Sequence, residues 1–183
     1  MRLYFRHIVL LLLVLGSSGH LCPIARAANE APELEYKLKA AFLFNFARFV
    51  KWPRVVENPS APFVFCVLGQ DPFGPALSAL QDRNIGEKAI KLHYANSVPN
   101  GLDQCQVLYI SRSESKSLQD ILNFTKEKPI ITVSDINGFA AASGMFEFVN
   151  TEGKLSFIIN NSAAQVSGIH VSSSLLSLAY KVQ

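Results

Sequence analysis

The sequence has little of what several function classes require. Its 183 residues include three cysteines, one tryptophan and 17% charged residues, with no long run of lysine or arginine. Nucleic-acid binding needs an excess of positive charge, so this class is disfavoured. The unbroken apolar run from Ile8 to Leu15 is far shorter than the roughly 20 residues that span a bilayer. A permanent membrane anchor, or direct membrane insertion, is therefore not expected.

The first 27 residues have the pattern of a secretory signal peptide. Arg2 and Arg6 form a basic start, the apolar run follows, and Ala25-Arg26-Ala27 offers the small residues that a signal peptidase reads. Cleavage there removes three arginines, which lowers the basic residues from 17 to 14, equal to the 14 acidic ones. We therefore expect residues 1–27 to be a signal and residues 28–183 to be one neutral, exported domain. A buried N-terminal helix is the alternative, against which the break at 16–20 argues.

Export leaves two cysteines, Cys66 and Cys105, since Cys22 leaves with the signal. An even number of cysteines in an exported chain favours a disulfide. Each lies in or just before an apolar run, and neighbouring strands would bring the two within bridging distance. Two buried free thiols remain the alternative. A metal site is not expected, because no paired histidines or carboxylates accompany the cysteines.

Strand and helix patterns alternate along the exported chain. Its first residues, 28–33, read as a short tail. The expected helices cover residues 33–51, 75–81, 113–127, 161–166 and 172–180, and the expected strands cover 63–68, 89–94, 107–110, 129–134, 145–149 and 154–159. This order is typical of an α/β fold with a mostly parallel central sheet flanked by helices. The last two strands predict a C-terminal antiparallel hairpin at the sheet edge.

The first expected helix is rich in aromatic residues. Apolar residues recur at three- to four-residue steps and predict the buried stripe, namely Leu34, Leu38, Phe42, Phe46 and Phe49. Phe44 differs from Phe42 by about 200° around the helix. Either both faces are covered, or one is an apolar patch for a partner. Phe44 and the single tryptophan, Trp52, are therefore candidate partner-binding residues.

Polar candidates lie at two other places. Asp71 follows the first buried strand and Ser111 follows another, where open α/β sheets bind ligands. Ser172 and Ser173 open the last expected helix, where serines cap the chain or its free N–H groups receive an anion, and His170 lies beside them. No nucleophile elbow or phosphate loop occurs, so we expect neither an enzyme nor a cofactor or metal.

Several strings together carry a family resemblance. They are Lys39 to Val50 with Trp52-Pro53, Cys66 to Gly69, Tyr109 to Ser111, Ile131 to Asp135, and Ser172-Ser173 with Leu175-Leu176. Over about residues 33–182 the chain resembles the YfiR family of periplasmic proteins. The resemblance implies an α/β domain that can dimerise, with a disulfide between Cys66 and Cys105. It gives no catalytic residues.

The resemblance also implies a function. Such proteins bind the periplasmic sensor domain of an inner-membrane diguanylate cyclase, which lowers cyclic di-GMP and biofilm formation. A periplasmic domain that binds a small molecule, without a cyclase partner, is the alternative. Some family members carry a second cysteine pair late in the chain, where this sequence has Ala140 to Gly144 and Glu147. Redox switching through that second pair is therefore not expected.

Overall fold

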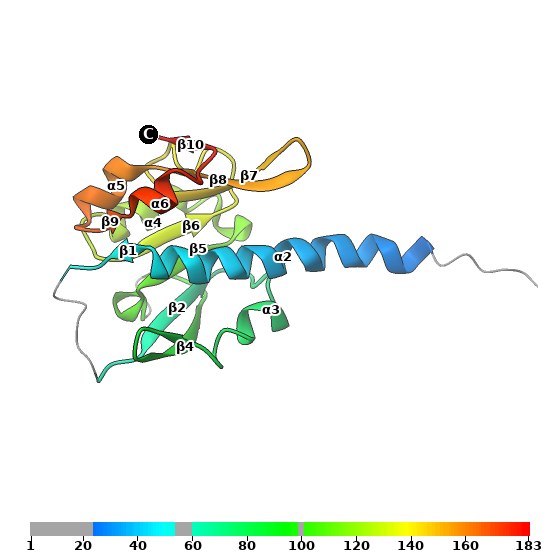
Figure 1. The fold of residues 1–183 in the computed structure, drawn as a ribbon, viewed down its shortest axis with the longest axis horizontal. Coiled ribbons are helices and arrows are strands. Elements are labelled where there is room, and N and C mark those ends of the chain that lie inside the picture. Colours follow the sequence, from blue (N-terminus) through cyan, green and yellow to red (C-terminus); the bar gives the residue numbers. More distant parts are fainter. Residues whose placement is uncertain (1–23, 54–59, 99–100) are drawn as a thin grey trace, which may run out of the picture. The chain divides into compact units, whose positions relative to one another are not determined.

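The structure, a computed structural model, describes residues 24–53, 60–98 and 101–183 (Figure 1). The chain divides into two compact units, residues 1–32 and 33–183, and the account below concerns the second. The expected signal peptide lies outside the described residues up to residue 23. Residues 28–33 belong to helix α2 (Ile24–Arg48), so the expected tail is wrong. Alanine and glutamate, which dominate this stretch, favour helix.

Eight strands form the main sheet, in the order β10-β8-β7-β6-β5-β2-β4-β3. They are β2 (Phe63–Leu68), β3 (Asn84–Ile85), β4 (Lys88–Ala95), β5 (Val107–Ile110), β6 (Ile131–Ser134), β7 (Phe146–Thr151), β8 (Lys154–Ile159) and β10 (Lys181–Val182). Strands β4, β2, β5, β6 and β7 run parallel, whereas β7 and β8 form an antiparallel hairpin. The predicted fold class is confirmed. The short strand β10 extends the sheet beyond the hairpin.

Short helices connect these strands. They are α3 (Pro75–Ser78), η2 (Leu102–Gln104), η3 (Arg112–Glu114), α4 (Leu118–Thr125), α5 (Asn161–Val166) and α6 (Ser173–Leu176). Helix α6 is shorter than the predicted helix 172–180, because the chain then turns into β10 and the Tyr180 N–H donates to the Phe157 carbonyl. A separate two-stranded ladder joins β1 (Val50–Lys51) to β9 (His170–Val171).

The central strands are buried on both faces, as in other parallel sheets. Phe63, Phe65 and Val67 of β2 face the core that contains α2, whereas Val64 and Leu68 face the core that contains α4. The ring of Phe46 on α2 stacks on Phe146 with centroids 4.5 Å apart. Figure 1 shows α2 crossing the sheet in front of these strands.

The predicted buried stripe of the first helix is only partly right, because Phe42 and Phe46 pack in the core as expected but the other three residues do not. Leu34, Leu38 and Phe49, expected to be buried, are 58%, 45% and 43% exposed. The buried side of the helix instead includes Lys39, which is 1% exposed. A lysine can face the core only where an opposite charge and hydrogen-bond acceptors surround its ammonium group.

Candidate functional site

A buried ion pair lies where β6 ends. Asp135 directly follows that strand, and its Oδ2 is 2.6 Å from the Lys39 Nζ on α2. The Tyr109 hydroxyl, on β5, donates to the Asp135 Oδ1 at 2.9 Å. Asp135 is only 3% exposed. The burial of two charged side chains is tolerated only when their remaining hydrogen-bonding positions are also filled.

Three further side chains fill those positions. The Tyr36 hydroxyl donates to the Asp135 Oδ2 at 3.3 Å, and the Arg112 Nε lies 3.2 Å from its Oδ1. Glu35 supplies a second carboxylate to Lys39, with its Oε1 2.6 Å from the Nζ. We call Glu35, Tyr36, Lys39, Tyr109, Arg112 and Asp135 the Asp135 cluster. It joins α2 to the carboxyl ends of β5 and β6.

The charges of the cluster reinforce one another. Burial alone would raise the pKa of Asp135, but the hydrogen bond and charge of Lys39, helped by Tyr109 and Arg112, lower it below its usual value. Burial would lower the pKa of Lys39, but its hydrogen bonds to Asp135 and Glu35 raise it. Burial and the nearby carboxylate strongly raise the pKa of Tyr109. A general acid or base works with a pKa near the operating pH, so this arrangement suits a structural clamp rather than proton transfer.

Asp71 and Ser111 lie at the same edge of the sheet but in different surroundings. The Asp71 carboxylate accepts from the backbone N–H groups of Phe73 and Gly74, at 2.9 and 3.2 Å, and so shapes its own turn. Ser111 is buried and precedes η3. A cavity of about 200 Å³ next to Asp135 is lined by Arg112, Ser115, Asp135, Ile136 and Asn137, and thus by neither predicted residue.

The two aromatic candidates differ in exposure. Phe44 is 8% exposed, and the guanidinium of Arg83 lies 4.7 Å from its ring centroid. Trp52 is half-buried against the edge of Phe63, and its Nε1 donates to the Ala47 carbonyl at 3.3 Å. The polar part of Trp52 is therefore used within the chain, while part of its ring reaches the surface.

The pairing of β1 with β9 gathers most of the other predicted residues. His170 lies opposite Lys51, the residue that precedes Trp52 in the sequence. Beside this pair, the Ser172 N–H donates to the Phe49 carbonyl at 3.0 Å. Ser172 caps α6, because its hydroxyl accepts from the Leu175 N–H at 3.2 Å. Asp71 lies in the turn after β2 and is not part of this ladder. The stretch of α2 from Lys39, in the Asp135 cluster, to Arg48, just before β1, is about 14 Å long at 1.5 Å per residue.

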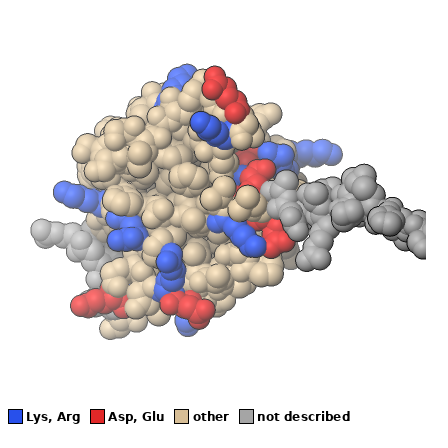
Figure 2. Space-filling model, turned by 45° about the vertical axis from the view of Figure 1, so that its right-hand side comes forward, with Lys and Arg blue, Asp and Glu red and all other residues tan. Residues whose placement is uncertain are grey.

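This gathering belongs to a segment without charge. No Asp, Glu, Lys or Arg occurs from Leu155 to Tyr180, which we call the uncharged segment. It contains α5, β9 and α6, which Figure 1 places side by side. Within it, Val166, Leu178 and Tyr180 are 56%, 71% and 62% exposed. On the face drawn in Figure 2, wide areas of uncharged atoms separate the scattered charges. The lack of charge was visible in the sequence, although residue motifs alone did not point to it.

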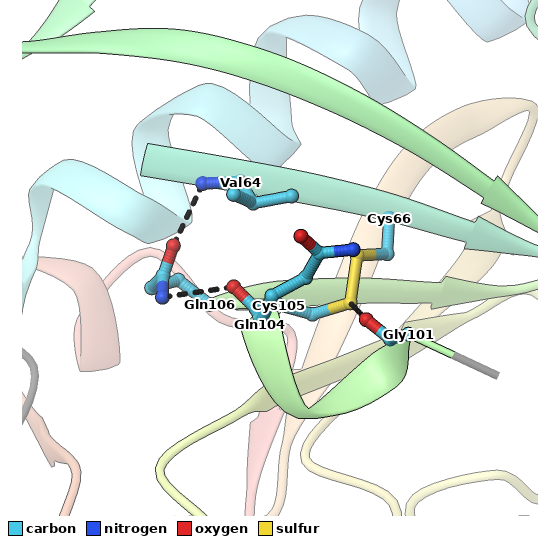
Figure 3. The surroundings of a disulfide bond; sticks show 6 residues. All are labelled: Val64, Cys66, Gly101, Gln104, Cys105 and Gln106. Atoms are coloured by element: carbon cyan, nitrogen blue, oxygen red, sulfur yellow. Dashed lines mark hydrogen bonds between the residues drawn. A yellow bond between two sulfur atoms is a disulfide. The ribbon is translucent and has the colours of Figure 1, made fainter. Parts of the chain in front are cut away.

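The structure contains the disulfide between Cys66 and Cys105, with the two Cα atoms 5.8 Å apart (Figure 3). It ties β2 to Cys105, which lies two residues before β5. The Gln106 side chain reinforces this tie, because its Oε1 accepts from the Val64 N–H at 2.7 Å and its Nε2 donates to the Gln104 carbonyl. The alternative of two free thiols is thereby excluded for this structure.

A carboxylate stabilises the loop that contains Gly138 and Ala140. Glu147, on β7, is 5% exposed, and its two oxygens accept from the N–H groups of Gly138 and Ala140, each at 2.9 Å. The Asn160 side chain donates to the Ala140 carbonyl from the opposite direction. Hydrogen bonds therefore hold this loop to the sheet edge.

Two features do not occur among the described residues. Among them, no helix has the length and apolar character to cross a membrane. Within the same ranges, no three His, Cys, Asp or Glu side chains gather as a metal site.

Comparison with known proteins identifies the family. No curated protein matches the chain. One similar solved structure is that of a conserved domain protein from Vibrio cholerae O1 biovar El Tor, with 14% identity and a TM-score of 0.47. That match covers 69% of this chain and 56% of the other, so this chain spans little more than half of its length. The DUF4154 family, described as YfiR/HmsC-like, matches residues 36–180. The match includes most of the Asp135 cluster, the disulfide and the uncharged segment, and the chain therefore belongs to the YfiR/HmsC-like family.

Proposed function

We propose that this protein is a periplasmic regulator that binds the sensor domain of an inner-membrane diguanylate cyclase and holds the enzyme inactive. Membership of the YfiR/HmsC-like family implies a regulatory role. The disulfide suits an oxidising compartment, and the N-terminal sequence has the pattern of an export signal. Inhibition then lowers cyclic di-GMP and biofilm formation.

The uncharged segment carries the proposal. The cores of protein interfaces are depleted of charged residues and hold aromatic and apolar anchors. Leu178 and Tyr180 offer such anchors, since both are more than half exposed. Full burial of one large apolar side chain contributes roughly 1.5–3 kcal/mol. We therefore assign partner contact to this segment.

The predicted site residues extend this surface. His170 is exposed on β9, Ser173 is exposed on α6, and β1 brings the half-buried Trp52 to the same ladder. The side chains of His170 and Ser173 offer hydrogen bonds, and the exposed part of Trp52 offers apolar contact, as suits the rim of such an interface. Phe44 and Asp71 contribute through the packing of α2 and the turn after β2.

A second apolar surface provides the matched control. Leu34 is 58% exposed on α2 and lies outside the uncharged segment. We propose to co-express the chain with a periplasmic-sensor diguanylate cyclase and to measure cellular cyclic di-GMP. The variants are Leu178→Glu and Leu34→Glu, each of which puts the same charge on an exposed leucine.

The native chain is expected to lower cyclic di-GMP, Leu178→Glu to lose most of this effect, and Leu34→Glu to retain it. Both variants should keep the native melting temperature, because exposed substitutions change stability by about 0.5 kcal/mol or less. The reverse pattern would move the docking surface to α2. No response of cyclic di-GMP to the native chain with any such cyclase would remove the proposed function.

A further inference from the structure

A second cavity, of about 440 Å³, lies between α4, α5 and the loop that precedes β7. It is distinct from the Asp135 cluster, and helix α5 of the uncharged segment, with Val166, forms one of its walls. Sites for small molecules typically enclose roughly 300–1,000 Å³. The cavity is therefore large enough for a molecule of the size of one sugar ring.

The lining is rich in uncharged hydrogen-bonding groups. Helix α4 and the residue after it contribute Gln119, Asn123 and Lys126, and the α5 region contributes Asn160, Ser162 and Ser167. Lys126 is the only charged residue in the lining, and no ion pair joins its side chain to another described residue. The lining contains no aromatic ring and no carboxylate.

Two hydroxyl groups have hydrogen-bonding capacity left at this cavity. Ser167 is 5% exposed as a residue, and its hydroxyl makes no hydrogen bond to another described residue. No buried side-chain polar atom in the described ranges lacks a partner, so this hydroxyl is accessible from the cavity. Thr132 is 1% exposed; its oxygen accepts from the Met145 N–H at 3.1 Å, which leaves its proton to donate. Thr125, by contrast, already donates to carbonyls of its own helix. The Ser167 hydroxyl and the Thr132 proton are therefore available to pair with a bound molecule in the cavity.

We propose that this cavity binds a small hydroxylated anion of the sugar-acid or sugar-phosphate type. The hydroxyl and amide groups of the lining match the hydroxyl groups of such a ligand. Lys126 pairs with its carboxylate or phosphate, as a charge-assisted hydrogen bond. A ligand with a flat aromatic ring finds no ring in the lining on which to stack.

The test titrates the purified protein with D-glucuronate, D-glucose 6-phosphate and the neutral D-glucose, followed by calorimetry and by amide NMR shifts. At least one anion should bind saturably and shift the amides of Ala163 and Ser167. Glucose should bind about tenfold more weakly, because it lacks the charge-assisted contact. The two anions distinguish a carboxylate ligand from a phosphate ligand.

Matched variants locate the site. Ser162 lines the cavity and is exposed, so Ser162→Phe should fill the cavity and abolish binding, whereas Ser162→Ala should not. Lys126→Met should weaken anion binding about tenfold, and Lys126→Arg should restore it. The proposal is overturned if neither anion binds saturably, or if binding persists unchanged in Ser162→Phe and Lys126→Met. No cyclase enters this experiment, so its outcome is independent of the proposed inhibitory function.

Discussion

The Asp135 cluster and the uncharged segment use charge in opposite ways. The cluster buries a lysine and an aspartate, and it surrounds them with two tyrosines, an arginine and a second carboxylate. The uncharged segment has no acidic or basic residue, yet it leaves Leu178 and Tyr180 exposed. The comparison indicates that charge fixes the position of α2 inside the molecule, whereas its absence prepares the other region for contact.

The difference also separates stability from recognition. Removing one partner of a buried ion pair leaves an uncompensated charge, which is costly. Substituting an exposed residue of the uncharged segment leaves the folded core as it was. Variants in the two regions should therefore move different measurements, and the predictions below test this, beginning with the largest effect.

Asp135→Asn is expected to have the largest effect on stability. It removes the main counter-charge of Lys39 inside the protein, at a cost of about 3–5 kcal/mol in the free energy of unfolding. Urea denaturation followed by circular dichroism measures this cost. The double variant Lys39→Met with Asp135→Leu should lose less free energy of unfolding than the sum of the losses in Lys39→Met and in Asp135→Leu, because the double variant leaves neither charge without its partner. A cost below about 1 kcal/mol for Asp135→Asn would show that the cluster does not hold α2.

Removal of the disulfide comes next. The bridge joins residues 39 positions apart, and in the chain-entropy account it stabilises the fold by about 4 kcal/mol. Cys66→Ala with Cys105→Ala should lower the free energy of unfolding by this order. Reduction of the native protein should act in the same direction and have no effect on the double variant. Equal stability with and without reductant would contradict a structural role for the bridge.

The pH dependence of stability follows from the cluster. The pKa of Asp135 is lowered in the folded state, so its contribution is present above the unfolded value of about 3.9 and is lost as the pH falls below it. The pKa of Lys39 is raised, so its contribution is present below about 10.4 and is lost as the pH rises above it. The free energy of unfolding, measured across pH, should fall on the acid side in the native protein. The part of this fall that depends on Asp135 should be absent from Asp135→Asn. An unchanged acid limb would contradict this assignment.

The helix cap gives the smallest effect. Ser172→Ala removes the hydroxyl that accepts from the Leu175 N–H, at a cost of about 1 kcal/mol in thermal or chemical unfolding. Ser174→Ala is the matched control. It is exposed on the same helix, its side chain caps nothing, and it should cost about 0.5 kcal/mol or less. Equal effects of the two variants would show that the cap contributes nothing at this position.

The sequence predicts the helices and strands of the fold better than it predicts the Asp135 cluster. The apolar runs predict β2, β5 and β6, and the residues around Gly153 predict the β7–β8 hairpin, because these signals are local. Strands β1, β3, β9 and β10 have two residues each, too few for any periodicity. Whether these residues form strands depends on the strands with which they pair.

The orientation of α2 shows why the Asp135 cluster is not predicted from the sequence. The predicted stripe places Leu34, Leu38 and Phe49 on the buried side, together with Phe42 and Phe46, which do face the core, because a lysine is expected to face water. Asp135 reverses this choice, yet it lies 96 residues away from Lys39. Only the tertiary fold brings them together. Two lysines, Lys37 and Lys39, lie in this part of the helix, and nothing local distinguishes the buried Lys39 from the exposed Lys37.

The 96-residue separation within the ion pair also constrains how the chain folds. Lys39 is made early and gains Asp135 only after β2, β5 and β6 have been made and aligned. Contacts between distant segments pay their loop-closure entropy before they return any stability. Docking of α2 onto the sheet is therefore expected late, after the central strands associate. Substitutions at Lys39 should then speed unfolding more than they slow folding.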